Sequence, residues 1–510
     1  MPSNKSNDAI DNDGMAKPQQ VKIHSDKFLN QLQTLPTSTT DNDIMIEGIV
    51  VHENGEPGAE KPPSNDITNN QEGILDSQAK TDVLLEEYKN EIKELTATED
   101  DDIEEPKLRA EYAVWKKNAV YLYDLMISTR IPWPSLTVEW LPDLENIDGG
   151  RLKRHKTLLG TQTSGNDKEF VRIGSIDLPE QRLPNGEKVV PDLSKYDVER
   201  GEIGGYLNSN HSKFTINQFI DHDGEVNRAR YMPQNPSIVA TMSSNGNAYM
   251  FDCTKHSLQP RGTPRPDIVL QHHTEEGYAL SWNRYTAGVL ATGAGDGTVA
   301  IWNVKNFRKP KPLLPTTVIR THTDLVNHVE WHTYHPSILG SVSDDKKVHI
   351  HDTRLTNVTT HPALESQGGH TGAINCLAFN PSNETYFATG GSDNAIVLWD
   401  MRHISTPLHH TIGHTDNINS IAWSPHFETV LASVSSDRRV MIWDTAQIGA
   451  EQTPEEKEQG SPELLFIHGG HTESVSDVAW NPHLPWVLAS VSNDNHLHIF
   501  KPAENIVETN

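Results

Sequence analysis

Between residues 106 and 130, apolar residues recur at alternating steps of four and three. They are Leu108, Tyr112, Trp115, Ala119, Leu122 and Met126, and charged residues such as Lys116 and Lys117 lie between them. This spacing places side chains on one face of an α-helix. The stretch begins at Pro106, and a proline in the first helical turn costs no hydrogen bond. We therefore predict an amphipathic helix over 106–130 that packs its apolar stripe on the domain that follows.

The chain after residue 131 contains a repeated unit. Each unit has a histidine, an Asp or Asn 23 residues later, and an aromatic residue or histidine 29 residues later. Short apolar runs such as 395–400 and 439–444 are rich in β-branched residues and end at turns, which predicts strands. A repeat of this length is typical of the four-stranded blade of a WD40 β-propeller. The six histidines that start the units are His222, His273, His322, His370, His414 and His471.

Six full units leave one blade to be supplied by the preceding segment. Residues 133 to about 215 contain the candidate strands 157–163 and 170–176. Strand residues before the first unit can also complete the last blade, which closes the ring and covers its exposed sheet edges. We predict an all-β fold: a seven-bladed propeller over 131–510 with an acidic loop at 449–463.

The first 105 residues differ from the rest in composition. They carry 24 acidic and 8 basic residues, a net charge of −16 out of −27 for the whole chain. Few of them are apolar, so they cannot bury enough surface to offset the entropy cost of folding. We predict a mostly disordered acidic extension over 1–105, in which residues 81–96 have the spacing of a short amphipathic helix.

The charge and the residue types exclude several functions. An acidic chain is poorly suited to direct DNA binding but attracts a basic partner; the same charge also favours solubility. Cys253 and Cys376 fit neither a disulfide framework nor a metal site, and no apolar stretch is long enough to cross a membrane. The recurring His and Asp residues belong to the repeat. We therefore expect a binding module rather than an enzyme, with no catalytic residue, metal or cofactor.

Several segments of the chain resemble one family. They are the runs 115–126, 133–143, 224–236, 276–283, 375–381, 461–472 and 504–507. Together they are similar to the retinoblastoma-binding histone chaperones, a WD40 family that includes the small subunit of chromatin assembly factor 1 and the second subunit of type B histone acetyltransferase. The resemblance covers about residues 105–508 and implies histone binding at two surfaces.

The first implied surface is a groove between the N-terminal helix and the acidic loop, which takes the first helix of histone H4. The loop lengthens the interval before His471 and is strongly acidic, although Gln459 and Lys457 stand where the family has an acidic and a small neutral residue. A loop of this charge can also be a simple solvated insertion. The residues implied for the groove are Asn118, Tyr121, Leu122, Glu455, Glu456, Glu458, Gln459, Leu465, Phe466 and Ile467.

The second implied surface is the top of the propeller channel, which holds the tail of histone H3. Three acidic family positions are Asn327, Asn417 and Asn493 here, and an aromatic position is Asn419. We therefore expect the top surface to bind a basic tail more weakly than the side groove binds its helix. The matching residues are Glu225, Asn227, Arg228, Glu276, Tyr278, Asn375 and Asn495.

The resemblance predicts a nuclear, partly cytoplasmic adaptor that presents histones to chromatin complexes. The expected partners include type B histone acetyltransferase, chromatin assembly factor 1, and deacetylase or methyltransferase complexes. A second hypothesis is a substrate receptor of a cullin-type ubiquitin ligase, because the runs 399–402 and 351–354 resemble the short WDxR motif of such receptors.

Overall fold

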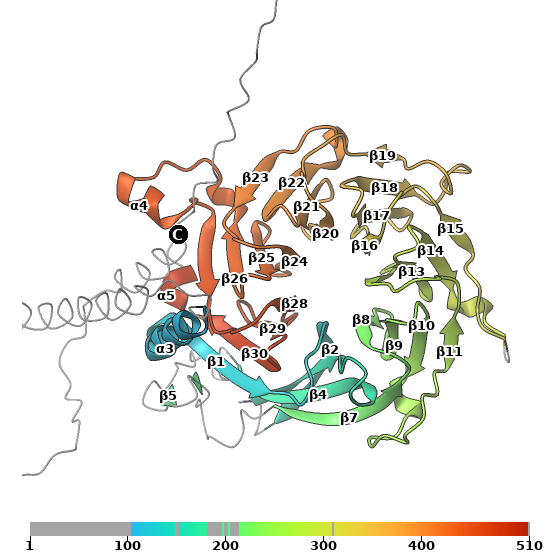
Figure 1. Cartoon of the computed structure of the whole chain (residues 1–510), viewed down its shortest axis with the longest axis horizontal. Coiled ribbons are helices and arrows are strands. Elements are labelled where there is room, and N and C mark those ends of the chain that lie inside the picture. The colour runs from blue at the N-terminus through green and yellow to red at the C-terminus, as the bar shows by residue number, and fades with distance from the viewer. Residues whose placement is uncertain are drawn as a thin grey trace, which may run out of the picture.

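The computed structural model describes residues 104–147, 152–180, 196–197, 202–203, 214–308 and 311–507. The extension predicted over 1–105, with the helix expected at 81–96, lies outside these residues except for its last two positions. Within the described residues, seven antiparallel sheets stand in a ring (Figure 1). The prediction of a seven-bladed β-propeller is confirmed.

The first three blades each have four described strands. Blade 1 contains β2 (Val138–Ile147), β3 (Leu152–Leu159), β4 (Glu169–Pro179) and β7 (Thr215–His222). Blade 2 contains β8 (Val226–Met232), β9 (Asn235–Ser243), β10 (Ala248–Asp252) and β11 (Ile268–Leu270). Blade 3 contains β12 (Ala279–Trp282), β13 (Val289–Gly293), β14 (Val299–Asn303) and β15 (Thr317–Ile319).

Blades 4 to 6 repeat the same order. Blade 4 contains β16 (Val326–Trp331), β17 (Ile338–Ser343), β18 (Val348–Asp352) and β19 (Leu364–Glu365). Blade 5 contains β20 (Ile374–Phe379), β21 (Tyr386–Gly391), β22 (Ala395–Asp400) and β23 (His409–Ile412). Blade 6 contains β24 (Ile418–Trp423), β25 (Val430–Ser435), β26 (Val440–Asp444) and β27 (Leu464–His468).

Blade 7 is assembled from both ends of the propeller. It contains β28 (Val475–Trp480), β29 (Leu488–Ser492), β30 (His496–Pro502) and β1 (Tyr123–Arg130), with the short strands β6 (Glu202–Ile203) and β5 (Tyr196–Asp197) at its edge. Strand β1 runs antiparallel to β30, from Tyr123 opposite Pro502 to Arg130 opposite His496. The predicted closure of the ring by an early strand is confirmed.

The N-terminal helix is shorter than predicted. Helix α3 spans Glu104–Leu122, and β1 begins at the next residue, so the helix predicted over 106–130 was wrong in its second half. The apolar pattern continues through Leu125, Met126 and Ile127, but all three are buried, which fits a strand covered on both faces. A periodicity of the helix type was read where the chain had already joined a sheet.

Each blade is fastened by the histidine and aspartate of its repeat, as predicted. In blade 4, His322 Nδ1 lies 2.9 Å from Asp345 and its Nε2 lies 2.8 Å from the hydroxyl of Ser341. Equivalent His–Asp contacts join His273 with Asp296, His370 with Asp393, His414 with Asp437 and His471 with Asp494. In the first unit, where Asn245 replaces the aspartate, His222 bonds to the Gly224 carbonyl instead.

A buried polar chain links α3 to the closing blade. The Trp115 indole N–H donates to the Tyr123 hydroxyl at 2.9 Å, and that hydroxyl lies 2.7 Å from His468 Nδ1. His468 Nε2 lies 3.0 Å from His498 Nδ1. All four residues are almost fully buried, so each polar group depends on the next one for its hydrogen bond. The chain therefore ties the helix, β1, β27 and β30 into one unit.

Replacing Tyr123 by Phe should destabilise the protein by about 1–3 kcal/mol, because it leaves buried groups of Trp115 and His468 without a partner. The matched control is Tyr121→Phe, two residues earlier, whose side chain is 56% exposed and which should change stability by less than about 0.5 kcal/mol. Urea unfolding followed by circular dichroism measures both. Equal midpoints for Tyr123→Phe and the parent would show that the hydroxyl is not needed.

The Asp437 carboxyl should make stability depend on pH. Burial alone would raise the pKa of Asp437, but the charge of His414 and its hydrogen bond lower it to about 2. The ordinary aspartate pKa of about 3.9 applies in the unfolded chain. The stabilisation is therefore complete above about pH 4 and is lost as the pH falls towards 2. Asp437→Asn should unfold at lower urea than the parent at pH 7, with a difference that shrinks below pH 4. A difference that stays constant down to pH 2.5 would contradict this.

Candidate functional site

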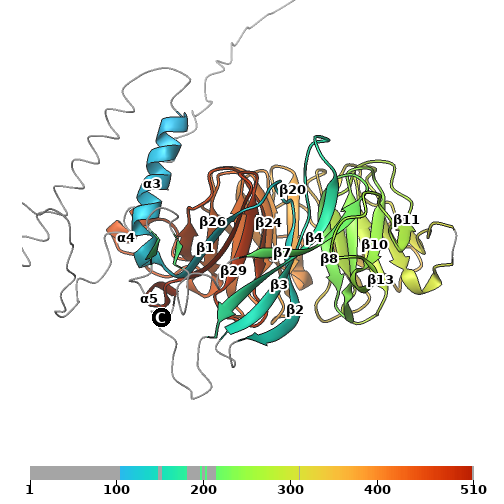
Figure 2. The ribbon, with the colours of Figure 1, turned by 90° about the horizontal axis from the view of Figure 1, so that it is seen from below.

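The helices of the described chain gather at one side of the ring. Figure 1 shows α3, α4 (Pro454–Gln459) and α5 (Glu504–Val507) outside blades 6 and 7, and Figure 2 shows α3 standing along this side. The end of α3 meets the C-terminal segment, since the Ala503 amide donates to the Leu122 carbonyl at 2.9 Å. We call the set α3, β27, α5 and the loop 449–463 the helix side.

Two contacts fix the position of α3. Trp115 packs so closely on Gly470 that a Cβ at this glycine would lie 2.6 Å from the indole ring, so a side chain there would displace the helix. Outside the core, Glu111 Oε2 accepts from Arg439 Nη2 at 3.0 Å. Neither partner was singled out from the sequence. The paired glycines before His471 were interpreted as a turn, whereas Gly470 makes room for Trp115.

The predicted groove residues divide into buried and accessible ones. Leu122 and Phe466 are completely buried and Ile467 is 2% exposed, all within the core. The expectation that these three would contact a partner was wrong, because a buried side chain has no surface to offer. Tyr121 is 56% exposed. Asn118 and Leu465 are half-buried, and the Asn118 amide donates to the Val114 carbonyl within the helix.

The loop 449–463 contains a short, well-capped helix. Thr453 and Glu456 form a reciprocal capping box at the start of α4, which fixes its first turn. Glu451 and Glu456 are exposed, whereas Glu463 is buried and lies 3.1 Å from His409. Glu463 therefore belongs to the propeller and not to the acidic surface. The side chains of Glu455, Glu458 and Gln459 lie outside the described part of the structure.

Four of the predicted top-surface residues come together at the channel mouth. The Asn227 amide donates to Glu276 at 2.8 Å, and Glu225 accepts from the Ser164 amide at 2.8 Å. Tyr278 lies beside both glutamates, and burial together with Glu276 raises its pKa to about 12. Partial burial raises the pKa of Glu225. The cluster offers two carboxyl groups and a phenol, which suits a ligand rich in hydrogen-bond donors.

Arg228 does not belong to this cluster. It lies inside the channel, 9% exposed, where its guanidinium reaches Asp477 at 3.4 Å and His328 at 2.8 Å. Arg230 contacts the same aspartate at 3.1 Å. The expectation that Arg228 lines the peptide site was wrong, because this arginine is used to balance a buried carboxylate. Nearby, burial raises the pKa of Glu139 and of Glu330 to about 7.

A belt of asparagines cross-links neighbouring blades at the top. Each donates its side-chain amide to a carbonyl of the next blade at 2.8–3.0 Å: Asn227 to Gly277, Asn327 to Ile374, Asn375 to Ile418 and Asn419 to Val475. Asn327 and Asn419, which depart from the family pattern, thus have a structural role. Asn495 lies apart from the other predicted residues, in the β29–β30 turn with a φ of 66°.

Three groups of side chains could in principle hold a metal ion. They are His322, His349 and His351; His468, His471 and His498; and His272, His273 and Asp296. In the first group, His322 and His349 stack at 4.0 Å, and both nitrogens of His322 are already hydrogen-bonded. Parallel stacked rings do not direct their lone pairs at one point, and binding an ion would break existing hydrogen bonds. These histidines are explained by the repeat.

Comparison with known families follows the same division of the chain. The family model of the histone-binding protein RBBP4, which also describes the equivalent component of the CAF1 complex, matches residues 110–180, and these include most of α3 and strands β1 to β4. The model of the WD domain, G-beta repeat, matches residues 314–352, 363–400, 405–444 and 462–501. Each of these last matches includes the outer strand of one blade and the three inner strands of the next. In the described residues, no helix is long and apolar enough to span a membrane.

The ring of seven blades and its His–Asp repeats define a WD40 propeller. The chain belongs to the histone-binding WD40 family described by the RBBP4 and CAF1 model, and histone binding as a chaperone or adaptor is its family function. Proteins of this kind are typically non-catalytic.

Proposed function

We propose that the helix side binds the first helix of histone H4. The observation that carries this proposal is the position of Tyr121, an exposed aromatic residue on α3 beside an acidic loop, within the segment matched by the histone-binding family model. An amphipathic basic helix has both an apolar face and a cationic face. Tyr121 and Leu465 supply apolar contact, and the loop 449–463 carries five glutamates against one lysine.

The buried residues act beneath this surface. Leu122 and Phe466 pack against Trp115 and Tyr123 in one core cluster, so they set the position of α3 relative to β27. Truncating either residue should cost about 2–5 kcal/mol of stability. Any loss of binding in such a variant would reflect a displaced helix, which makes exposed residues the better test.

We expect Tyr121→Ala to weaken binding of a histone H4 first-helix peptide by about tenfold or more, because aromatic residues at the centre of an interface contribute most. The control is Tyr285→Ala, which removes an equally exposed tyrosine (54%) from blade 3. Calorimetric titration measures both, with circular dichroism as the test of folding. If the two variants bind the peptide equally well, the helix side is not the H4 site.

Glu451→Lys should also weaken binding, by a smaller factor that shrinks as salt rises, since exposed charges are screened. Glu451 is preferable to Glu456, because a change at Glu456 would also remove the capping box of α4. A loss that is the same at 50 mM and 300 mM salt would argue against an electrostatic role for the loop.

We further propose that the channel mouth holds the tail of histone H3, weakly. Glu225 and Glu276 provide carboxyl groups, while Asn417 and Asn493 are exposed amides where additional acidic groups would strengthen attraction for a basic tail. Asn327 is unsuitable for such a change, because its amide lies 2.6 Å from Asp344 and a glutamate there would face a like charge.

Changing Asn417 and Asn493 together to Glu should tighten binding of an unmodified H3 tail peptide by about tenfold at low salt, as each gained charge-assisted hydrogen bond contributes roughly 1.5–3 kcal/mol before screening. Fluorescence anisotropy of a labelled tail peptide measures the change. The same pair changed to Gln is the control for shape. No difference between the Glu and Gln variants would place the tail elsewhere.

These surfaces support a role as a nuclear, non-catalytic adaptor that carries H3 and H4 for complexes such as type B histone acetyltransferase and chromatin assembly factor 1. The ligase-receptor hypothesis has less support. Its WDxR-like runs form local ion pairs, with Arg402 2.5 Å from Asp400 and Arg354 2.6 Å from Asp352. Identification of the proteins that co-purify with the full chain separates the two: histones and components of chromatin complexes, or a ligase adaptor.

A further inference from the structure

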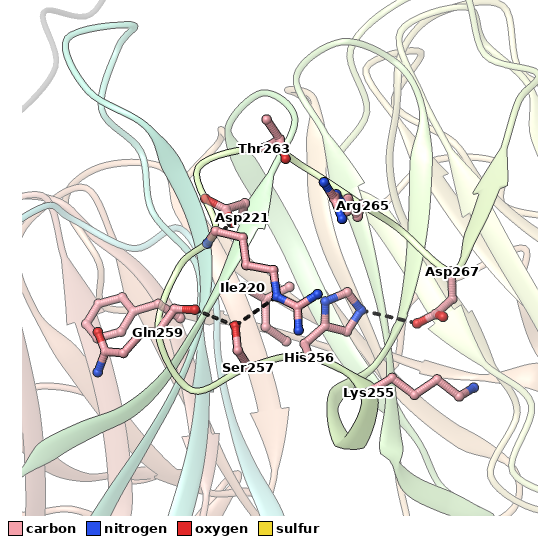
Figure 3. Close-up of a pocket in the computed structure, with 11 residues that line it drawn as sticks. Ile220, Asp221, Lys255, His256, Ser257, Gln259, Thr263, Arg265 and Asp267 are labelled. Atoms are coloured by element: carbon pink, nitrogen blue, oxygen red, sulfur yellow. Dashed lines mark hydrogen bonds and ion pairs between the residues drawn. The ribbon is translucent and has the colours of Figure 1, made fainter.

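A polar pocket of about 180 Å³ lies where blade 1 meets blade 2. Its walls are the outer strand β7 and the connection from β10 to β11, which begins with the 3-10 turn Cys253–Lys255 (Figure 3). Apart from Phe219 and Ile220, every lining residue is polar or charged: Asp221, Lys255, His256, Ser257, Gln259, Arg261, Thr263, Arg265 and Asp267. The pocket shares no residue with the helix side or with the channel mouth.

The connection that forms the pocket is held in place by hydrogen bonds. The backbone amides of Arg261 and Gly262 donate to the buried Asp221 carboxylate, at 2.7 Å and 3.0 Å. The Phe219 amide donates to the Leu258 carbonyl at 3.0 Å, which adds the connection to the edge of β7. The shape of the pocket therefore exists before any ligand arrives, so binding needs little reorganisation.

The carboxylates of the pocket are already satisfied, whereas its arginines are not. Asp221 accepts the two backbone amides, and Asp267 accepts from the Asp252 amide at 2.7 Å and lies 3.2 Å from His256 Nε2. Arg261 uses only its Nε, which donates to the Ser257 hydroxyl at 3.2 Å. Among the described residues, neither Arg261 nor Arg265 has an acidic side chain within ion-pair distance.

The neighbouring lysines add to this charge. Lys255 lines the pocket, although it also pairs with Asp252 at 2.8 Å. Lys168 reaches the same connection, because a Cβ placed on Gly262 would lie 3.5 Å from its ammonium group. The chain as a whole carries a net charge of −27, so this cationic pocket is a local exception. It suits an anionic partner and is unsuited to a basic histone.

We propose that this pocket binds a phosphorylated serine or threonine in a segment of a partner protein. Two guanidinium groups can donate paired hydrogen bonds to phosphate oxygens, a geometry for which arginine is well suited. The hydroxyls of Ser257 and Thr263 offer further donors at the wall. Leu258, 64% exposed on the same connection, provides an apolar contact for a residue that flanks the phosphate, which favours a peptide over a free anion.

The test uses the full chain and a peptide library with phosphoserine or phosphothreonine fixed at the centre and degenerate flanking positions. Its unphosphorylated counterpart is the first control. We expect at least about tenfold stronger retention of the phosphorylated library, and loss of that preference in the double variant Arg261→Gln, Arg265→Gln. The matched variant is Arg308→Gln, an exposed arginine in the equivalent connection of blade 3, which should bind as the parent does.

Each other outcome would overturn the proposal. Equal retention of both libraries, or retention of neither, would show that the pocket does not recognise a phosphorylated side chain. An undiminished preference in the double variant would place the site elsewhere on the chain. Inorganic phosphate and inositol hexakisphosphate are titrated in parallel, and binding of these alone would identify a site for free anions. Circular dichroism of the double variant excludes misfolding as the cause of a loss.

Discussion

The pairing of β1 with β30 is the interaction on which the rest of the structure depends. It joins residues more than 360 positions apart in the chain and converts an open row of sheets into a ring without a free edge at that point. Because α3 runs directly into β1, the same pairing places the helix against blade 6, the blade that carries the acidic loop. The closing strand thus brings together the two halves of the proposed histone surface.

The core beneath this surface is polar in part, and its polar groups are matched to one another. Trp115, Tyr123, His468 and His498 each come from a different element, so their hydrogen bonds form only when helix, closing strand and two blades are all in place. Burial lowers the pKa of His468 and of His498 well below the usual value, which keeps them neutral at physiological pH. Such a network favours one position of α3 over nearby alternatives.

Three electrostatic environments coexist in this acidic protein. The helix side and the channel mouth present carboxyl groups to solvent, where they attract basic segments at long range. The channel interior balances Asp477 with Arg228 and Arg230, which leaves little net charge to act outside. The pocket between blades 1 and 2 is the reverse of the first two, with arginines that lack acidic partners. The distribution of charge, more than its sum, separates the sites for partners of opposite sign.

The repeat spacing by itself determined the propeller, the number of blades and the His–Asp pairs, because these depend on local periodicity that recurs in every unit. The apolar stripe also predicted α3, but its end at Leu122 was decided by β30, since a buried strand and a helix face share the same residue types at Leu125 and Met126. Sequence likewise named the right region for the site without separating Tyr121, which is exposed, from Leu122, which is buried. That difference, like the inward turn of Arg228 and Glu463, arises from contacts between residues far apart in the chain, and only the packed ring brings those residues together.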